Sequence, residues 1–170
     1  MNAVDILRYG HSFIEVKVSG LPEAAWYPAG VVGHWSVKDV VAHLASFEQM
    51  LVELLGTFPG GEAQTPALDR FRADQLAFND DEVERRHHLS APGIWEEYVA
   101  AYQKALALLE KIPVEQRRRE GTLPWYGAEY SLDDFLVYTF YGHKREHGAQ
   151  IDAYRSRLDP ETMLAGEKIL

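Results

Sequence analysis

The sequence predicts an all-α protein built as a four-helix bundle. Four segments place apolar residues at intervals of three and four, which gathers them on one face of an α-helix. Capping or helix-ending residues flank these segments, including two Ser-x-x-Asp sequences. The 170 residues contain no internal repeat and no linker-like stretch, so we expect a single domain over residues 1–170.

The first two helices are expected over about residues 2–20 and from Ser36 to Gly56. The first is interrupted after Leu21 by Pro22. At the start of the second, the Ser36 hydroxyl accepts a first-turn amide and Asp39 opposes the positive end of the helix dipole. One apolar stripe then runs along this helix, through Val37, Val40, Val41, Leu44, Phe47, Leu51 and Leu55.

The next stretch, residues 56–90, is the least regular part of the chain, with a short helical piece around Leu68–Phe78. A long connection of this kind suits a bundle whose second and third helices run parallel. The third helix is expected from about Ser90 to Ile112, before Pro113. The fourth is expected from Ser131 to about Leu158, before Asp159-Pro160.

Composition narrows the function classes. The chain has 17 Lys and Arg against 26 Asp and Glu, a formal net charge of −9 that repels nucleic acid and anionic lipid. No apolar run reaches the length of a membrane helix, and the N-terminus lacks a signal-peptide pattern, so we expect a cytoplasmic protein. Because the sequence has no cysteine, any metal ligand must be nitrogen or oxygen.

Three histidines suggest a chemistry. His143 and His147 are four residues apart near the middle of the core-facing stripe of the fourth helix, so both rings can reach one ion. His43 lies at the shoulder of the buried stripe of the second helix, where it can point toward a neighbouring helix. These residues are candidate ligands of a divalent metal, and three nitrogens leave coordination positions open, as in catalytic sites.

An alternative is that these are metal-free core histidines with local hydrogen bonds. Asp39 and Glu146 are candidates for orienting metal ligands, and equally for surface charges. The aromatic residues near helices two and four are mostly expected to be core or interface residues. If there is a metal pocket, its walls are expected to include Trp35, Trp125, Tyr126 and Tyr141. His11 is expected to be an ordinary core contact near Leu7 and Ile14.

The chain resembles the DinB/YfiT-like superfamily of four-helix bundles, and within it the ClbS/DfsB branch most closely. The matching motifs are W-S-x-K-D-x-x-x-H-L from Trp35 to Leu44, Phe78-Asn79 in the connection, and H-x-x-x-H from His143 to His147. The resemblance implies an up-down-down-up bundle, often dimeric, in which His43, His143 and His147 hold a divalent metal such as nickel or zinc. Characterised members include thiol-cofactor transferases, a maleylpyruvate isomerase and a self-resistance hydrolase.

These observations favour a small metal-dependent detoxification enzyme that acts on electrophilic metabolites. The metal would activate either a water molecule or a low-molecular-weight thiol for attack, so hydrolysis and thiol transfer both remain open. The expected partners are a small-molecule ligand and a second copy of the chain. The alternative is a non-catalytic small-molecule-binding protein or dimeric scaffold, with the metal absent or structural.

Overall fold

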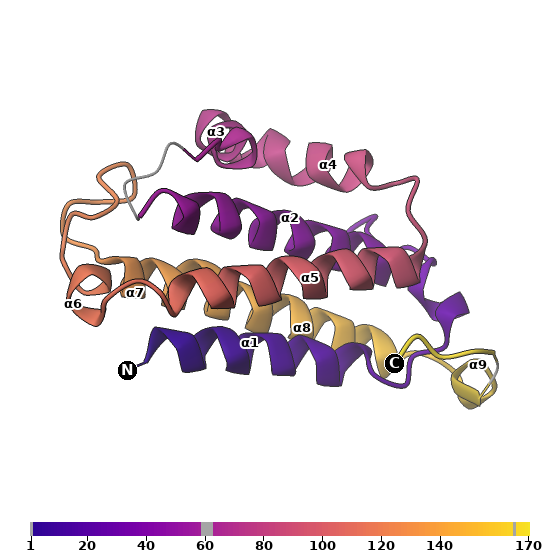
Figure 1. Ribbon diagram of the computed structural model, residues 1–170. Coiled ribbons are helices and arrows are strands. Elements are labelled where there is room, and N and C mark those ends of the chain that lie inside the picture. The colour runs from indigo at the N-terminus through magenta and orange to yellow at the C-terminus, as the bar shows by residue number, and fades with distance from the viewer. Residues whose placement is uncertain (1, 59–62, 165) are drawn as a thin grey trace.

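The computed structural model describes residues 2–58, 63–164 and 166–170, which form an all-α bundle (Figure 1). Three long helices are α1 (Ala3–Val18), α2 (Val37–Gly56) and α5 (Ala91–Leu109). The fourth rod is continuous and comprises α7 (Leu132–Phe135), η2 (Leu136–Gly142) and α8 (His143–Arg155). The four expected helices are therefore all present, with ends within a few residues of those predicted.

The directions of the helices match the expected up-down-down-up order. In Figure 1, α1 and the α7–α8 rod run from left to right, whereas α2 and α5 run from right to left. The long connection between α2 and α5 contains α3 (Pro66–Ala73) and α4 (Gln75–Arg85), which cover α2. It is therefore more helical than the sequence pattern indicates. Short helices complete the described chain: η1 (Glu23–Trp26), α6 (Val114–Arg117) and α9 (Pro160–Leu164).

Both Ser-x-x-Asp sequences form the predicted capping boxes. Ser36 accepts a hydrogen bond from the amide of Asp39, and the Asp39 carboxylate accepts the amide of Ser36 at 2.9 Å. Ser131 and Asp134 repeat this arrangement at the start of α7. Two backbone donors are satisfied at each helix start, which fixes where the helix begins.

The described residues include no helix that is both long and apolar enough to span a membrane.

The fourth rod departs from a regular α-helix. Leu136–Gly142 is a π-helix, whereas the sequence pattern predicts an uninterrupted α-helix. Buried residues recur at every fourth position here, at Leu132, Leu136, Phe140, Lys144 and Gly148. A straight α-helix would rotate such a row by about 40° at each step, and the wider π turn offsets part of that drift. The insertion therefore keeps the row against the core.

Candidate metal centre

A polar layer crosses the middle of the bundle and divides its core in two. One apolar cluster includes Leu51 and Leu132, and the other includes Val40 and Ile151. Between them, three helices of the bundle contribute polar side chains. These are His11 from α1, His43, Ser46 and Glu48 from α2, and His143, Lys144 and His147 from α8; Tyr98 and Tyr102 of α5, which belong to the two apolar clusters, contact this layer through His11 and Lys144. Buried polar groups need partners, so this layer is where a site is expected.

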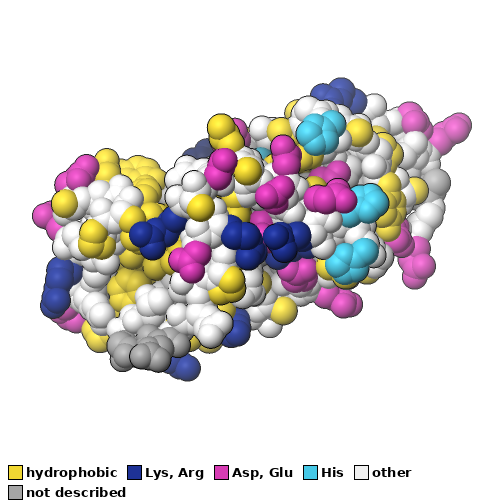
Figure 2. All heavy atoms as spheres, turned by 90° about the horizontal axis from the view of Figure 1, so that it is seen from above, with side chains coloured by type: hydrophobic (Ala, Val, Ile, Leu, Met, Phe, Trp, Pro, Cys, Tyr) yellow, Lys and Arg dark blue, Asp and Glu magenta, His cyan; other side chains and the backbone are white. Residues whose placement is uncertain are grey.

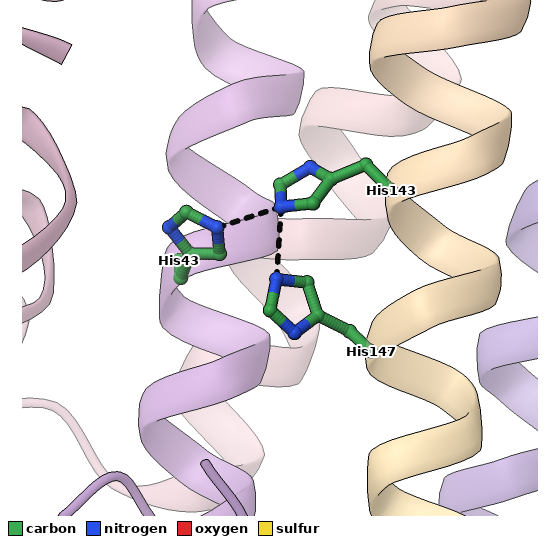
Figure 3. Close-up of side chains that lie close together, drawn as sticks. All are labelled: His43, His143 and His147. Carbon is green, nitrogen blue, oxygen red and sulfur yellow. Dashed lines mark hydrogen bonds between the residues drawn. The ribbon is translucent and has the colours of Figure 1, made fainter. Parts of the chain in front are cut away.

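Three imidazoles of this layer converge between α2 and α8 (Figure 3). The Nε2 atom of His143 lies 2.8 Å from Nε2 of His43 and 2.8 Å from Nε2 of His147. One ring nitrogen from each residue lies within 4.8 Å of the other two. His43 and His147 are buried, with 2% and 7% of the residue surface exposed to solvent, and His143 is half-buried. The sequence therefore correctly anticipates which histidines meet.

Electrostatics keep these imidazoles neutral. Burial, together with the neighbouring His143 and His147, lowers the pKa of His43 to about 2. Burial, followed by the effects of His147 and Lys144, lowers the pKa of His143 to about 3. Burial also lowers the pKa of His147, although Gln150 and Glu146 oppose the shift. Neutral imidazole is the form that binds metal, because its ring nitrogen keeps a lone pair.

The donor set fits a divalent ion such as zinc or nickel. A zinc–nitrogen bond is about 2.0–2.1 Å, so nitrogens around a tetrahedral ion are roughly 3.3 Å apart, somewhat wider than the 2.8 Å spacing here. Small side-chain rotations open that spacing. His147 is already oriented, since its Nδ1 donates to Oε1 of Gln150 at 2.7 Å and leaves Nε2 free to ligate. Nδ1 of His43 is buried and lacks a hydrogen-bond partner within the described residues.

A pocket of about 640 Å³ lies beside the cluster, and His143 forms part of its wall. Aromatic side chains dominate the lining and come from α2, α3, the segment after α6 and the fourth rod. They are Phe47, Phe71, Trp125, Tyr126, Phe135 and Tyr138. Gly142 and Thr139 of the π-helix also border it, so the irregular turn forms one side of the pocket. The volume is typical of sites for small organic ligands.

The structure places the four predicted pocket residues in three different settings. Trp125 and Tyr126 line the pocket. Trp35 is outside its lining but lies against His43, with the ring centroids 5.0 Å apart and the ring planes tilted, and its Nε1 donates to Asp80. Tyr141 lies on the opposite side of the rod, against Gly10 of α1 and the Arg145 guanidinium. Tyr141 is two residues before His143, which at about 100° per residue places it on nearly the opposite face of the rod, away from the pocket lining.

The two residues predicted to orient metal ligands, Asp39 and Glu146, also lie in different settings. Asp39 is occupied as the capping carboxylate of α2, where it accepts from Ser36. Glu146 lines the pocket, and its charge opposes the lowering of the pKa of His147. The residue that bonds a candidate ligand is Gln150, which sequence reasoning missed. Its position three residues after His147, on the same helix face, was the available signal.

Sequence reasoning also missed a buried ion pair next to the cluster. Lys144 pairs with Glu48, and their side chains are 2% and 0% exposed. The ammonium group faces the rings of Tyr98 and Tyr102 at 5.6 and 5.5 Å from their centroids. His11 stacks on Tyr102 with the centroids 3.9 Å apart, which makes it a core contact as expected. Lys144 lies at the centre of the core-facing stripe of the fourth rod, and the adjacent His143 lines the pocket.

Comparison with known proteins supports the superfamily. The family model described as the mycothiol maleylpyruvate isomerase N-terminal domain, a DinB/YfiT-like four-helix family, matches residues 7–132. The matched part runs from α1 to the start of α7, so it contains His43 and ends before His143 and His147. Neither the curated proteins nor the solved structures contain a significant match.

Proposed function

This chain belongs to the mycothiol maleylpyruvate isomerase N-terminal domain family, and from that premise we propose that it is a metal-dependent enzyme of the cytoplasm that detoxifies small electrophilic metabolites. The observation that carries the proposal is the convergence of three neutral imidazoles beside an aromatic pocket. The thiol named in the family description favours transfer to a low-molecular-weight thiol over hydrolysis.

His43, His143 and His147 would hold the ion. A divalent ion bound by three nitrogens lowers the pKa of a coordinated thiol or water and so supplies the nucleophile. The chain's own residues perform the remaining tasks. Gln150 fixes the ring of His147 through a 2.7 Å hydrogen bond. Phe47 lies against both His43 and His143, with centroids 4.8 and 4.5 Å apart, and so shields the cluster from bulk water.

The pocket would hold the electrophile against His143. Its aromatic walls favour flat apolar groups, which they bury without requiring charged partners. In thiol transfer a carbon–sulfur bond forms, the leaving group departs with its electron pair, and the thiol proton goes to solvent. In hydrolysis the oxygen of water takes the place of sulfur.

The test uses untagged full-length protein, because an affinity tag of histidines would itself bind metal. Metal content is measured by elemental analysis, and turnover is followed with 1-chloro-2,4-dinitrobenzene, with and without thiol and chelator. We expect about one divalent ion per chain and a thiol-dependent, chelator-sensitive release of chloride. Formation of 2,4-dinitrophenol without thiol would instead indicate hydrolysis.

Variants separate catalysis from the alternatives. His143→Ala and His147→Ala should lose both metal and turnover, whereas His34→Ala should lose neither, because the His34 side chain is 82% exposed in the loop before α2. Metal loss that only lowers the melting temperature would indicate a structural ion. A chain that binds small molecules without metal or turnover would be a binding protein or scaffold.

We also propose that the protein is a homodimer, which sedimentation analysis tests.

A further inference from the structure

One wall of the pocket is a row of residues along the fourth rod. Four of them line the pocket at intervals of three or four: Phe135, Thr139, Gly142 and Glu146. Such intervals place residues on one face of a helix. Gly142 is the member of the row without a side chain, and it directly precedes His143, which lines the same wall. The wall is therefore recessed beside the candidate metal ligand.

The backbone does not require glycine at this position. Gly142 has φ −57° and ψ −47°, which are ordinary right-handed helical values that any residue except proline adopts easily. Within a helix, glycine is also less favourable than alanine, because it loses more conformational freedom when the chain folds. Local conformation alone would therefore favour a residue with a side chain at position 142.

Close packing between helices does not explain the glycine either. Gly148 of α8 shows what such packing looks like, because a Cβ atom there would overlap the ring of Phe13 of α1. A Cβ atom at Gly142 would have ordinary surroundings. Apart from its chain neighbours and its own helical turn, it would meet within 4 Å only the carbonyl oxygen of Val137, at 3.7 Å, among the described residues. The space beside Gly142 is therefore open.

The opposite wall of the pocket comes from α3 and α4. Seen from above, charged side chains are spread over the outer face of these helices (Figure 2). Phe71 is instead buried, and it lines the pocket together with Gln75 and Asn79. The pocket is the space between this wall and the rod, so any side chain added at Gly142 would occupy part of it.

We propose that Gly142 is a specificity-determining residue, whose missing side chain lets a ring-sized apolar group reach His143. The inference rests on the proposed function for the reaction at His143 and narrows its substrate class. If a ring lies directly beside His143, the reacting atom belongs to the ring or is attached to it, as in activated aromatic electrophiles. The aromatic side chains of Trp125 and Tyr126 in the same pocket favour stacking of such a ring.

The experiment measures stability and ligand size in the same variants. The probes are benzamide and 2-naphthamide, which are uncharged and differ by one ring. They are titrated by calorimetry into full-length protein, first with chelator and then with added zinc. We expect Gly142→Ala to raise the melting temperature by about 2–4 °C, because alanine favours the helix. The same variant should weaken 2-naphthamide binding by about tenfold, since one methyl group crowds the pocket, and benzamide binding by less than about threefold.

A larger side chain and a matched glycine complete the test. Gly142→Leu should weaken 2-naphthamide binding by more than about 100-fold. Gly93→Ala, in the first turn of α5 and outside the pocket lining, should leave both probe affinities unchanged. Zinc affinity should stay within about threefold of the wild type in Gly142→Ala, which shows that His143 keeps its place.

Three results would overturn the inference. The first is a wild type that binds neither probe. The second is a Gly142→Ala variant that binds 2-naphthamide as tightly as the wild type, or that weakens both probes equally. The third is a parallel loss of zinc affinity in this variant, because the methyl group would then act by displacing His143. Probe binding is independent of turnover, so size selection by a protein without metal or activity would refute the proposed enzyme and leave this inference standing.

Discussion

Lys144 and Glu48 form an ion pair at the centre of the bundle, where neither side chain is more than 2% exposed. The pair links α8 to α2, the two helices that carry the three histidines. Neither its carboxylate oxygens nor its ammonium group has a further hydrogen-bond partner among the described residues. Each charge therefore depends on the other, because removal of one leaves the second uncompensated in a low-dielectric interior.

Breaking this pair should destabilise the protein strongly. We expect Lys144→Met to lower the free energy of unfolding by about 3–5 kcal/mol, measured by urea denaturation. The double variant Lys144→Met/Glu48→Leu should recover most of the loss, since apolar residues of similar volume replace a buried ion pair at little cost. The control is Lys17→Met, which removes a partly exposed pair with Asp152 and should lose less than about 1 kcal/mol. Equal losses for both lysines would contradict this assignment.

His11 should make stability depend on pH. Burial and the charge of Lys144 lower its pKa from 6.5 to about 4 in the folded protein. Between these values the unfolded chain takes up a proton that the folded chain does not, so stability falls as the pH falls from about 6.5 to 4. His11→Phe keeps a ring beside Tyr102 and removes this titration. Its free energy of unfolding should decline less over that range than that of the wild type, and parallel curves would argue against the assignment.

Gln150 should tune metal affinity through His147. Its amide oxygen accepts from Nδ1 of His147 at 2.7 Å, which holds Nε2 toward the other two rings. Loss of such a partner typically weakens a metal site by about 10–100-fold. We therefore expect Gln150→Leu to weaken zinc binding in competition with a chromophoric chelator, without abolishing it. Gln103→Leu, on the exposed face of α5, is the matched control. Affinities within twofold of each other would show that Gln150 does not orient the ligand.

Much of the fold is predictable because its causes are local. The capping boxes at Ser36 and Ser131 and the apolar stripe of α2 depend on residues three or four apart, and both appear as expected. The convergence of His43 with His143 and His147 follows from the same periodicity, since an apolar stripe fixes which side chains face a neighbouring helix. The directions of the helices were predicted from the long connection over residues 56–90, which suits parallel second and third helices, together with the family resemblance.

Features that depend on packing between distant segments were not predictable. Glu48 and Lys144 look like surface residues in isolation, and only their meeting across the bundle permits burial. The pocket walls combine Phe71 of α3 with Phe135 of α7, which lie 64 residues apart in sequence. The π turn arises because buried residues spaced four apart in the sequence must all face the same core. No single residue type therefore indicates it in the sequence.

The π turn should be required for the three imidazoles to meet. It adds one residue to the rod between the cap at Ser131 and the ligands, and thereby sets the rotation of α8 relative to α7. Insertion of one alanine after Tyr138, which is 62% exposed within this turn, would add a second extra residue that the turn does not absorb. With α7 held by its capping box, His143 and His147 would then rotate by about 100° relative to α2.

We expect this insertion to weaken zinc binding by more than about 100-fold, a larger effect than loss of a supporting hydrogen bond, because two ligands leave the site together. Tyr138→Ala changes the same place in the turn and keeps the residue count, so its zinc affinity should stay within about threefold of the wild type. Circular dichroism tests whether the insertion variant is still helical. If it folds and binds zinc normally, α8 positions its histidines independently of the turn, and the π-helix has no role in building the site.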